Sequence, residues 1–112
     1  MPLQLSTIQP SPDTISPPDD VSLNFTLTAN VGADYIVSYN LALGNNLYFQ
    51  QTDGTLVKQL VDPGTAGGTL TVFNKDVRIV SKGPKANTSF VLKVVVREGL
   101  NGDTKSCKIW IS

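Results

Sequence analysis

Residues 21–29 read VSLNFTLTA, and this stretch decides the fold class. Apolar side chains occupy every second position from Val21 to Ala29, and serine, asparagine or threonine fills the positions between them. A period of two residues is typical of a β-strand that has one face buried and the other in water. The sequence therefore predicts a half-buried strand here.

The same two-residue period recurs along the chain. It is present in YIVSYNLAL (35–43), SFVLKVVVRE (89–98) and TKSCKIWIS (104–112), and in the shorter pieces GTLTVF (68–73) and DVRIV (76–80). No window shows the spacing of an amphipathic helix. The apolar phase predicts a buried core that includes Leu23, Phe25, Val37, Leu92, Val94 and Ile109. Cys107 shares this phase, so we expect it to be buried as a small hydrophobic residue.

Turn residues separate the predicted strands. Asp53-Gly54 and Asn101-Gly102 are dipeptides that suit tight hairpin turns, and we expect Gly102 to adopt a positive φ. The segment DPGTAGG (62–68) indicates a longer loop. Residues 1–20 include the proline-rich QPSPDTISPPDD, and proline has no N–H for a sheet ladder. We therefore expect 1–20 to be an edge strand, interrupted by proline, that crosses from one sheet to the other.

The stretch NNLYFQQ (45–51) resembles the protease site ENLYFQ(G/S) that is engineered into expression tags. It departs from that site at Asn45, where the site has glutamate, and at Gln51. Leu47, Phe49 and Gln51 alternate with Tyr48 and Gln50, and an Asp-Gly turn follows. The pattern favours a strand that enters a hairpin over a cleavage site.

Seven or eight short strands, with a turn about every ten residues, indicate an antiparallel β-sandwich. The 112 residues are enough for one domain and too few for two ordinary ones, so we expect 1–112 to be a single domain.

Both ends of the chain resemble a known family. LSTIQPSPDTISPPDDVSLNFTLTA (5–29) resembles the opening of bacterial immunoglobulin-like repeats, and VLKVVVREGLNGDTKSCKIWI (91–111) resembles their last hairpin and equally that of fibronectin type III modules. Residues 44–75 lack the middle segment usual in those repeats. The resemblance implies an immunoglobulin-like β-sandwich. It also implies a non-catalytic module of a surface, secreted or virion protein.

The residue inventory argues against catalysis. The sequence contains no histidine, one cysteine and one glutamate, so Ser-His and Cys-His activation and His-ligated metal sites are impossible. No phosphate-binding loop or nucleophile-elbow motif occurs. Asp19 and Asp20 are adjacent, and we interpret them as a solvated pair, with a Ca²⁺ site as the alternative. We expect no enzyme activity, no cofactor and no metal.

Charge is distributed unevenly along the chain. Residues 1–74 carry one base against six acids, a net charge of −5, whereas residues 75–112 carry eight bases against three acids, a net charge of +5. Such asymmetry can mark an acid-binding face or a head-to-tail contact between copies, but a β-fold that interleaves both halves would mix the signs, and we favour this second interpretation. The sequence pI near 6.1 and the lack of aromatic residues among the basic ones predict no nucleic-acid binding.

Trp110 is out of phase with Ile109 and Ile111, so it is expected on the outer face of its strand. Tyr48 is a second candidate for an outward aromatic residue, and exposed aromatics can stack on sugar rings or anchor a protein. Alternatively, Trp110 covers Val95 or the stem of Lys93 on a neighbouring strand. The last hairpin adds Leu100, Asn101 and Asp103 as candidate partner or glycan contacts.

These observations favour a non-catalytic binding or architectural module that contacts a protein partner or a neighbouring domain. One alternative is a carbohydrate-binding module of a larger enzyme, and a second is a self-assembling virion or fibre protein. The family resemblance predicts an extracellular, cell-surface or virion location. The N-terminus shows no signal peptide, so a cytoplasmic location stays open. No apolar run approaches the ~18 residues that span a bilayer, so we expect no membrane insertion.

Overall fold

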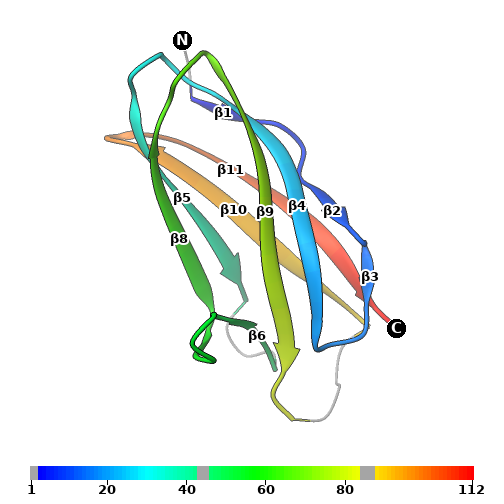
Figure 1. Ribbon diagram of the computed structural model, residues 1–112. Helices are drawn as coiled ribbons and strands as arrows, with labels where there is room; N and C mark the ends of the chain where they lie inside the picture. The colour runs from blue at the N-terminus through cyan, green and yellow to red at the C-terminus, as the bar shows by residue number, and fades with distance from the viewer. Residues whose placement is uncertain (1–2, 43–45, 84–87) are drawn as a thin grey trace.

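Figure 1 shows the computed structural model, which describes residues 3–42, 46–83 and 88–112. Over these residues the chain forms eleven β-strands and no helix, which confirms the all-β class. In chain order the strands are β1 (Gln4–Leu5), β2 (Gln9–Ser11), β3 (Thr14–Ile15), β4 (Asp19–Thr28), β5 (Asp34–Leu41), β6 (Leu47–Gln50), β7 (Leu56–Val57), β8 (Gln59–Thr65), β9 (Leu70–Ser81), β10 (Ser89–Glu98) and β11 (Asn101–Ile111).

The strands form two curled sheets that face each other (Figure 1). Sheet A has the order β1-β4-β9-β6-β7, with β2 also paired to β4, and sheet B has the order β3-β11-β10-β5-β8. The pairs in both sheets are antiparallel except for β3 with β11. Eleven strands exceed the expected seven or eight, because the N-terminal segment alone supplies three short ones.

The alternating side chains meet between the two sheets. Every core residue expected from the sequence is at most 4% exposed: Leu23, Phe25, Val37, Leu92, Val94 and Ile109. Phe25 of sheet A stacks on Phe73, with ring centroids 4.8 Å apart, and meets the edge of Tyr39 from sheet B at 6.3 Å. The period of two in the sequence therefore arises because the inner face of each sheet is buried and the outer face is exposed to solvent.

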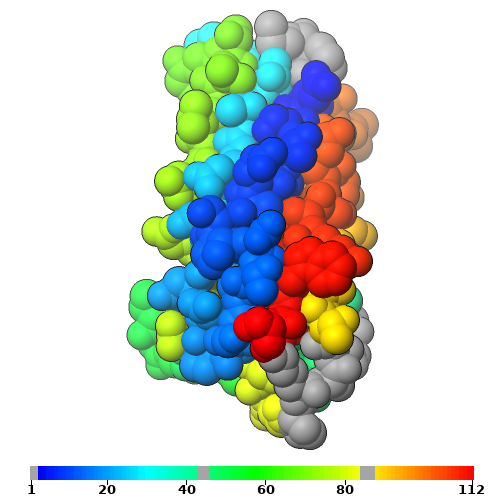
Figure 2. Space-filling model, turned by 90° about the vertical axis from the view of Figure 1, so that its right-hand side faces the viewer, coloured from blue at the N-terminus to red at the C-terminus, as the bar shows by residue number. Residues whose placement is uncertain are grey.

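The proline-rich N-terminal segment lies along one flank of the sandwich. β1 and β2 pair with β4 in sheet A, and β3 then pairs with β11 in sheet B. Figure 2 shows this segment, in blue, running beside the last strand, in red. Leu5, Ile8 and Ile15 are buried, so the segment closes this flank of the core.

Two segments differ from the sequence-based expectation. GTLTVF and DVRIV belong to one strand, β9, because the alternation of inward and outward side chains continues through Asn74 and Lys75. The loop expected at 62–68 begins only after Thr65. Pro63 fits within β8 because β8 is an edge strand. Its ladder bonds to β5 use the neighbouring positions, as Leu41 N–H to Lys58 O shows, so the nitrogen of Pro63 faces away from β5.

The Asp-Gly turn after β6 is confirmed. Gly54 has a φ of +89°, and the Asp53 carboxylate accepts a hydrogen bond from the Thr55 N–H at 2.9 Å. Hydrogen bonds from Thr55 hold the pKa of Asp53 below its usual value. Leu47–Gln50 form strand β6, so the interpretation of NNLYFQQ as a strand entering a hairpin is confirmed over these residues; Asn45 lies outside the described residues.

The prediction for the last hairpin is wrong at Gly102. Glu98 pairs with Asn101, so the turn consists of Gly99 and Leu100, and Gly102 lies within β11. Gly99 is the residue at positive φ, at +58°. A glycine at the first central position is what a two-residue type II′ turn favours, whereas the Asn-Gly pair would have required a later turn and a shifted register.

Gly99→Ala is expected to lower the free energy of unfolding by about 1–2 kcal/mol, because an L side chain is disfavoured at positive φ. Urea denaturation monitored by tryptophan fluorescence measures the change. Gly67→Ala is the matched control, since an added Cβ at Gly67 meets no atom within 4 Å and its φ is not positive. Equal stabilities of the two variants would contradict the assigned turn.

Candidate functional site

The outer face of sheet B presents apolar and basic side chains together. Phe90, Leu92, Val94 and Val96 of β10 point into the core, so the residues between them point outward. The register places Ile36 beside Arg97, and Val91 beside Lys108. We call this surface the basic face, defined by Ile36, Val61, Val91, Lys93, Arg97, Lys108 and Trp110. Its three aliphatic members are each 51% exposed.

The cations of the basic face lack acidic partners within the described part of the chain. The ion pairs found there lie elsewhere: Lys75 with Asp62 at 2.9 Å, and Arg78 with Asp20 at 3.3 Å. These two pairs join the basic and acidic halves of the sequence, so the predicted mixing of charge is confirmed there. Lys93 and Arg97 have no such contact, which leaves an excess of positive charge on the basic face.

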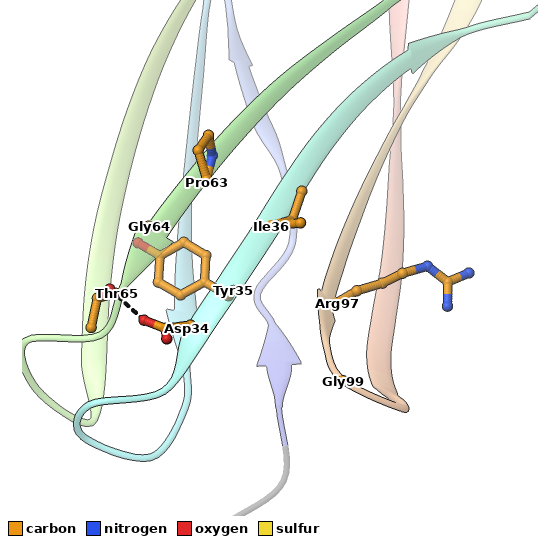
Figure 3. Close-up of a pocket in the computed structure, with 8 residues that line it drawn as sticks. All are labelled: Asp34, Tyr35, Ile36, Pro63, Gly64, Thr65, Arg97 and Gly99. Carbon is orange, nitrogen blue, oxygen red and sulfur yellow. Dashed lines mark hydrogen bonds between the residues drawn. The ribbon is translucent and has the colours of Figure 1, made fainter.

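A surface pocket of about 600 Å³ lies at the hairpin end of the basic face (Figure 3). Ile36 and Pro63 supply apolar lining, and Arg97 and Gly99 lie on the side of the last hairpin. The Asp34 carboxylate accepts a hydrogen bond from the Thr65 hydroxyl at 2.6 Å. The Tyr35 ring lies against Gly64, where an added Cβ would come within 2.6 Å of the tyrosine oxygen. Glycine at 64 thus makes room for the ring.

The structure separates the contact residues that were predicted from sequence. Trp110 is 46% exposed and points outward, as predicted. Leu100 is fully exposed at the hairpin tip, and Asn101 begins β11, about 30 Å along the strand from Trp110. Tyr48 belongs to sheet A, where it is half-buried with the Lys58 Nζ 4.3 Å from its ring centroid. Of the predicted residues, Trp110 alone is among those that define the basic face.

Asp103 has a structural contact within the fold. Its Oδ2 accepts a hydrogen bond from the Leu5 N–H at 2.7 Å. Leu5 is buried in sheet A, whereas Asp103 belongs to sheet B, so this bond ties the N-terminal segment to the last hairpin.

Replacement of Asp103 by alanine should lower the free energy of unfolding by about 1–2 kcal/mol, because the Leu5 N–H would lose an ionised acceptor. Faster amide exchange at Leu5, measured by NMR, should accompany the loss. Asn101→Ala serves as control, since Asn101 is exposed and its side chain makes no contact of this kind. Unchanged exchange at Leu5 in Asp103→Ala would contradict the assigned role.

The sequence did not predict that Ile36, Val61 and Arg97 belong to one surface. A signal was present, because Ile36, Val91 and Val95 are aliphatic residues on the polar phase of their strands. An aliphatic residue at such a position is exposed unless another element covers it.

Two kinds of side chain bear on chemistry, metal ligands and nucleophiles. Within the described residues, no group of three or more histidine, cysteine, aspartate or glutamate side chains is placed to hold a metal ion. Cys107 is 8% exposed, as predicted, and burial raises the pKa of its thiol to about 11, so the thiol is protonated at neutral pH. Over the same residues no helix is long and apolar enough to cross a membrane.

Comparison with known proteins gives no family for the chain. No protein-family model matches the sequence, and no curated protein matches it significantly.

Proposed function

We propose that the chain is a non-catalytic, immunoglobulin-like module that binds a protein partner through the basic face. The strand orders support the immunoglobulin-like part. The order β1-β4-β9-β6 in sheet A is similar to the A-B-E-D order of that fold, and the order β11-β10-β5 in sheet B is similar to its G-F-C order. Residues 47–65 depart from the strand order of that fold. There the chain forms β6 in sheet A before it forms β8 beside β5 in sheet B.

One observation carries the binding proposal: aliphatic side chains and unpaired cations share one exposed surface. Ile36, Val61 and Val91 supply apolar area, and Lys93 and Arg97 supply charge with no acidic partner within the described residues. A partner that offers carboxylates around an apolar patch would satisfy both. Charge complementarity of this kind raises the association rate and selects the partner.

The alternative functions have weaker support. A sugar-binding platform needs free aromatic faces, but the Lys108 Nζ lies 4.2 Å from the Trp110 ring centroid and Lys58 lies over Tyr48. Assembly through opposite charge halves needs those halves on separate surfaces, but ion pairs join them within one molecule. A protein partner is therefore the proposed ligand class.

Affinity capture with matched baits tests the proposal. The wild-type chain, the variant Lys93→Glu/Arg97→Glu and the control Lys82→Glu/Lys105→Glu are immobilised and exposed to extract and medium of the source cells. The two variants change net charge equally, but the control alters exposed residues outside the basic face. We expect a protein that wild type and control retain, that the first variant loses, and that elutes with salt. Equal retention by all three baits, or no retention by wild type, would contradict the proposal.

A further inference from the structure

Strand β9 has an unpaired edge over most of its length. β4 pairs with it from Leu70 to Ile79 on one side. On the other side, β6 pairs only with Ile79, Val80 and Ser81, because β6 ends at Gln50 and the chain turns away. Among the residues that the structure describes, none therefore pairs with Leu70–Arg78 on that side.

The hydrogen bonds at its two ends identify which groups of β9 are free. The Ala29 N–H donates to Thr69 O at 3.1 Å on the β4 side, and the Lys82 N–H donates to Asn46 O at 2.7 Å on the β6 side. The direction of the backbone groups alternates along an antiparallel strand. The even-numbered residues Leu70, Val72, Asn74 and Asp76 thus direct N–H and C=O toward the free edge.

The Leu70–Asn74 part of this edge lacks the proline and the charges that discourage pairing at other edges, whereas Lys75 and Asp76 follow it. β8 carries Pro63, β2 carries Pro10 and β11 carries Lys105 and Lys108, all of which discourage an added strand. The segment Leu70–Asn74 contains neither proline nor charge. Two of its three outward side chains are apolar and exposed, Leu70 at 58% and Val72 at 75%, and the third is Asn74.

A recess continues the free edge toward β6. It has a volume of about 430 Å³ and is lined by residues 50–53 after β6, 60–62 of β8 and 75–78 of β9. Beside it, the Tyr39 ring packs opposite Leu60 and 5.5 Å from the Lys75 Nζ. The Tyr39 side chain is buried, and this burial together with the nearby Asp62 carboxylate raises the pKa of its hydroxyl.

We propose that an extended segment of another polypeptide adds to sheet A beside β9, pairs with Leu70–Asp76, and places a lysine or arginine at the recess. Three carboxylates line the recess against two cations, so its lining has a net charge of −1. Asp62 pairs with Lys75 inside the recess, and Arg78 pairs with Asp20 outside it, which leaves Asp53 and Asp76 without an ion pair among the described residues.

β8 flanks the same edge (Figure 1), and the Lys75–Asp62 ion pair joins β8 to β9, so a second whole sandwich beside β9 would meet β8. We therefore propose a single extended segment as the occupant. This surface shares Val61 with the basic face and none of the other residues that define it.

Amide hydrogen exchange with a synthetic strand tests the inference. The probe is a short capped peptide that alternates valine with threonine and lysine, added to millimolar concentration. Exchange at Leu70, Val72 and Asn74 should slow by about tenfold or more, since these N–H groups gain acceptors. Thr71 and Phe73 should not change, because β4 already protects them. The same peptide with its lysines replaced by glutamate should protect less.

Two controls separate strand addition from other binding. N-methylation of alternate peptide residues removes the bonds to β9 and should abolish the protection. Val72→Pro removes an N–H that faces the free edge and none that faces β4, and it should abolish the protection at Asn74, whereas Val72→Thr should keep it. No slowing with the first peptide, equal slowing with the N-methylated or glutamate peptide, or equal slowing in Val72→Pro would overturn the proposal.

Discussion

Replacement of Phe49 by alanine is expected to lower the free energy of unfolding by about 3–5 kcal/mol, the largest effect among the substitutions considered. Phe49 is 0% exposed and lies in β6, the four-residue strand between Leu47 and Gln50. The loss combines the transfer energy of the ring with a cavity between the sheets, because neighbouring strands can relax only in part. Denaturation by guanidinium chloride measures it.

The control for Phe49→Ala is Gln51→Ala, one residue beyond the strand and exposed to solvent. It should change stability by less than about 0.5 kcal/mol. The sequence allowed no firm strand assignment for residues 44–75, so this pair tests the part of the fold that was hardest to predict. A loss below about 1 kcal/mol for Phe49→Ala would show that β6 does not pack on the core.

Leu92→Ala should cost about 2–5 kcal/mol by the same mechanism. Leu92 is 0% exposed at the centre of sheet B, where it pairs with Leu41 on one side and Cys107 on the other. Val91→Ala is the matched control, since Val91 belongs to the same strand but points outward and is half exposed. Thermal unfolding of both variants measures the two losses of stability. A larger loss for Val91→Ala than for Leu92→Ala would show that the inward and outward positions of β10 are assigned the wrong way round.

Much of the fold could be predicted from the period of two. Where one face of a strand is buried and the other wet, as in β4 and β10, a slip of one residue would expose every apolar side chain. The sequence therefore determines which residues face the core. Leu23, Leu92 and Cys107 are buried, as their positions in the alternation predicted. The Asp53-Gly54 turn was predictable too, because few dipeptides suit positive φ.

Features set by tertiary contacts escaped prediction. Gly99 and Gly102 both fit a hairpin turn locally, and the pairing of β10 with β11 decides between them. The segment 62–65 has loop composition but forms a strand, because an edge position tolerates Pro63. No local pattern could reveal that Asp103 binds the N–H of Leu5, 98 residues away in the chain.

In the candidate site, too, one feature could be predicted from local sequence and the others depend on tertiary contacts. The outward position of Trp110 came from local phase. The basic face required the register of β5, β8 and β10, which places Ile36, Val61 and Arg97 on one surface. Charge counted along the chain gives an acidic and a basic half, and the fold joins these halves through the Lys75–Asp62 and Arg78–Asp20 pairs, as expected for interleaved strands.

The most direct test of the proposed function is NMR mapping of the captured partner on the isotope-labelled chain. The account predicts that amide signals of Ile36, Val61, Lys93 and Arg97 shift or broaden on titration, whereas those of Asn24 and Thr26 on the outer face of sheet A do not. Perturbations confined to sheet A, with the basic face unchanged at saturating partner, would contradict it.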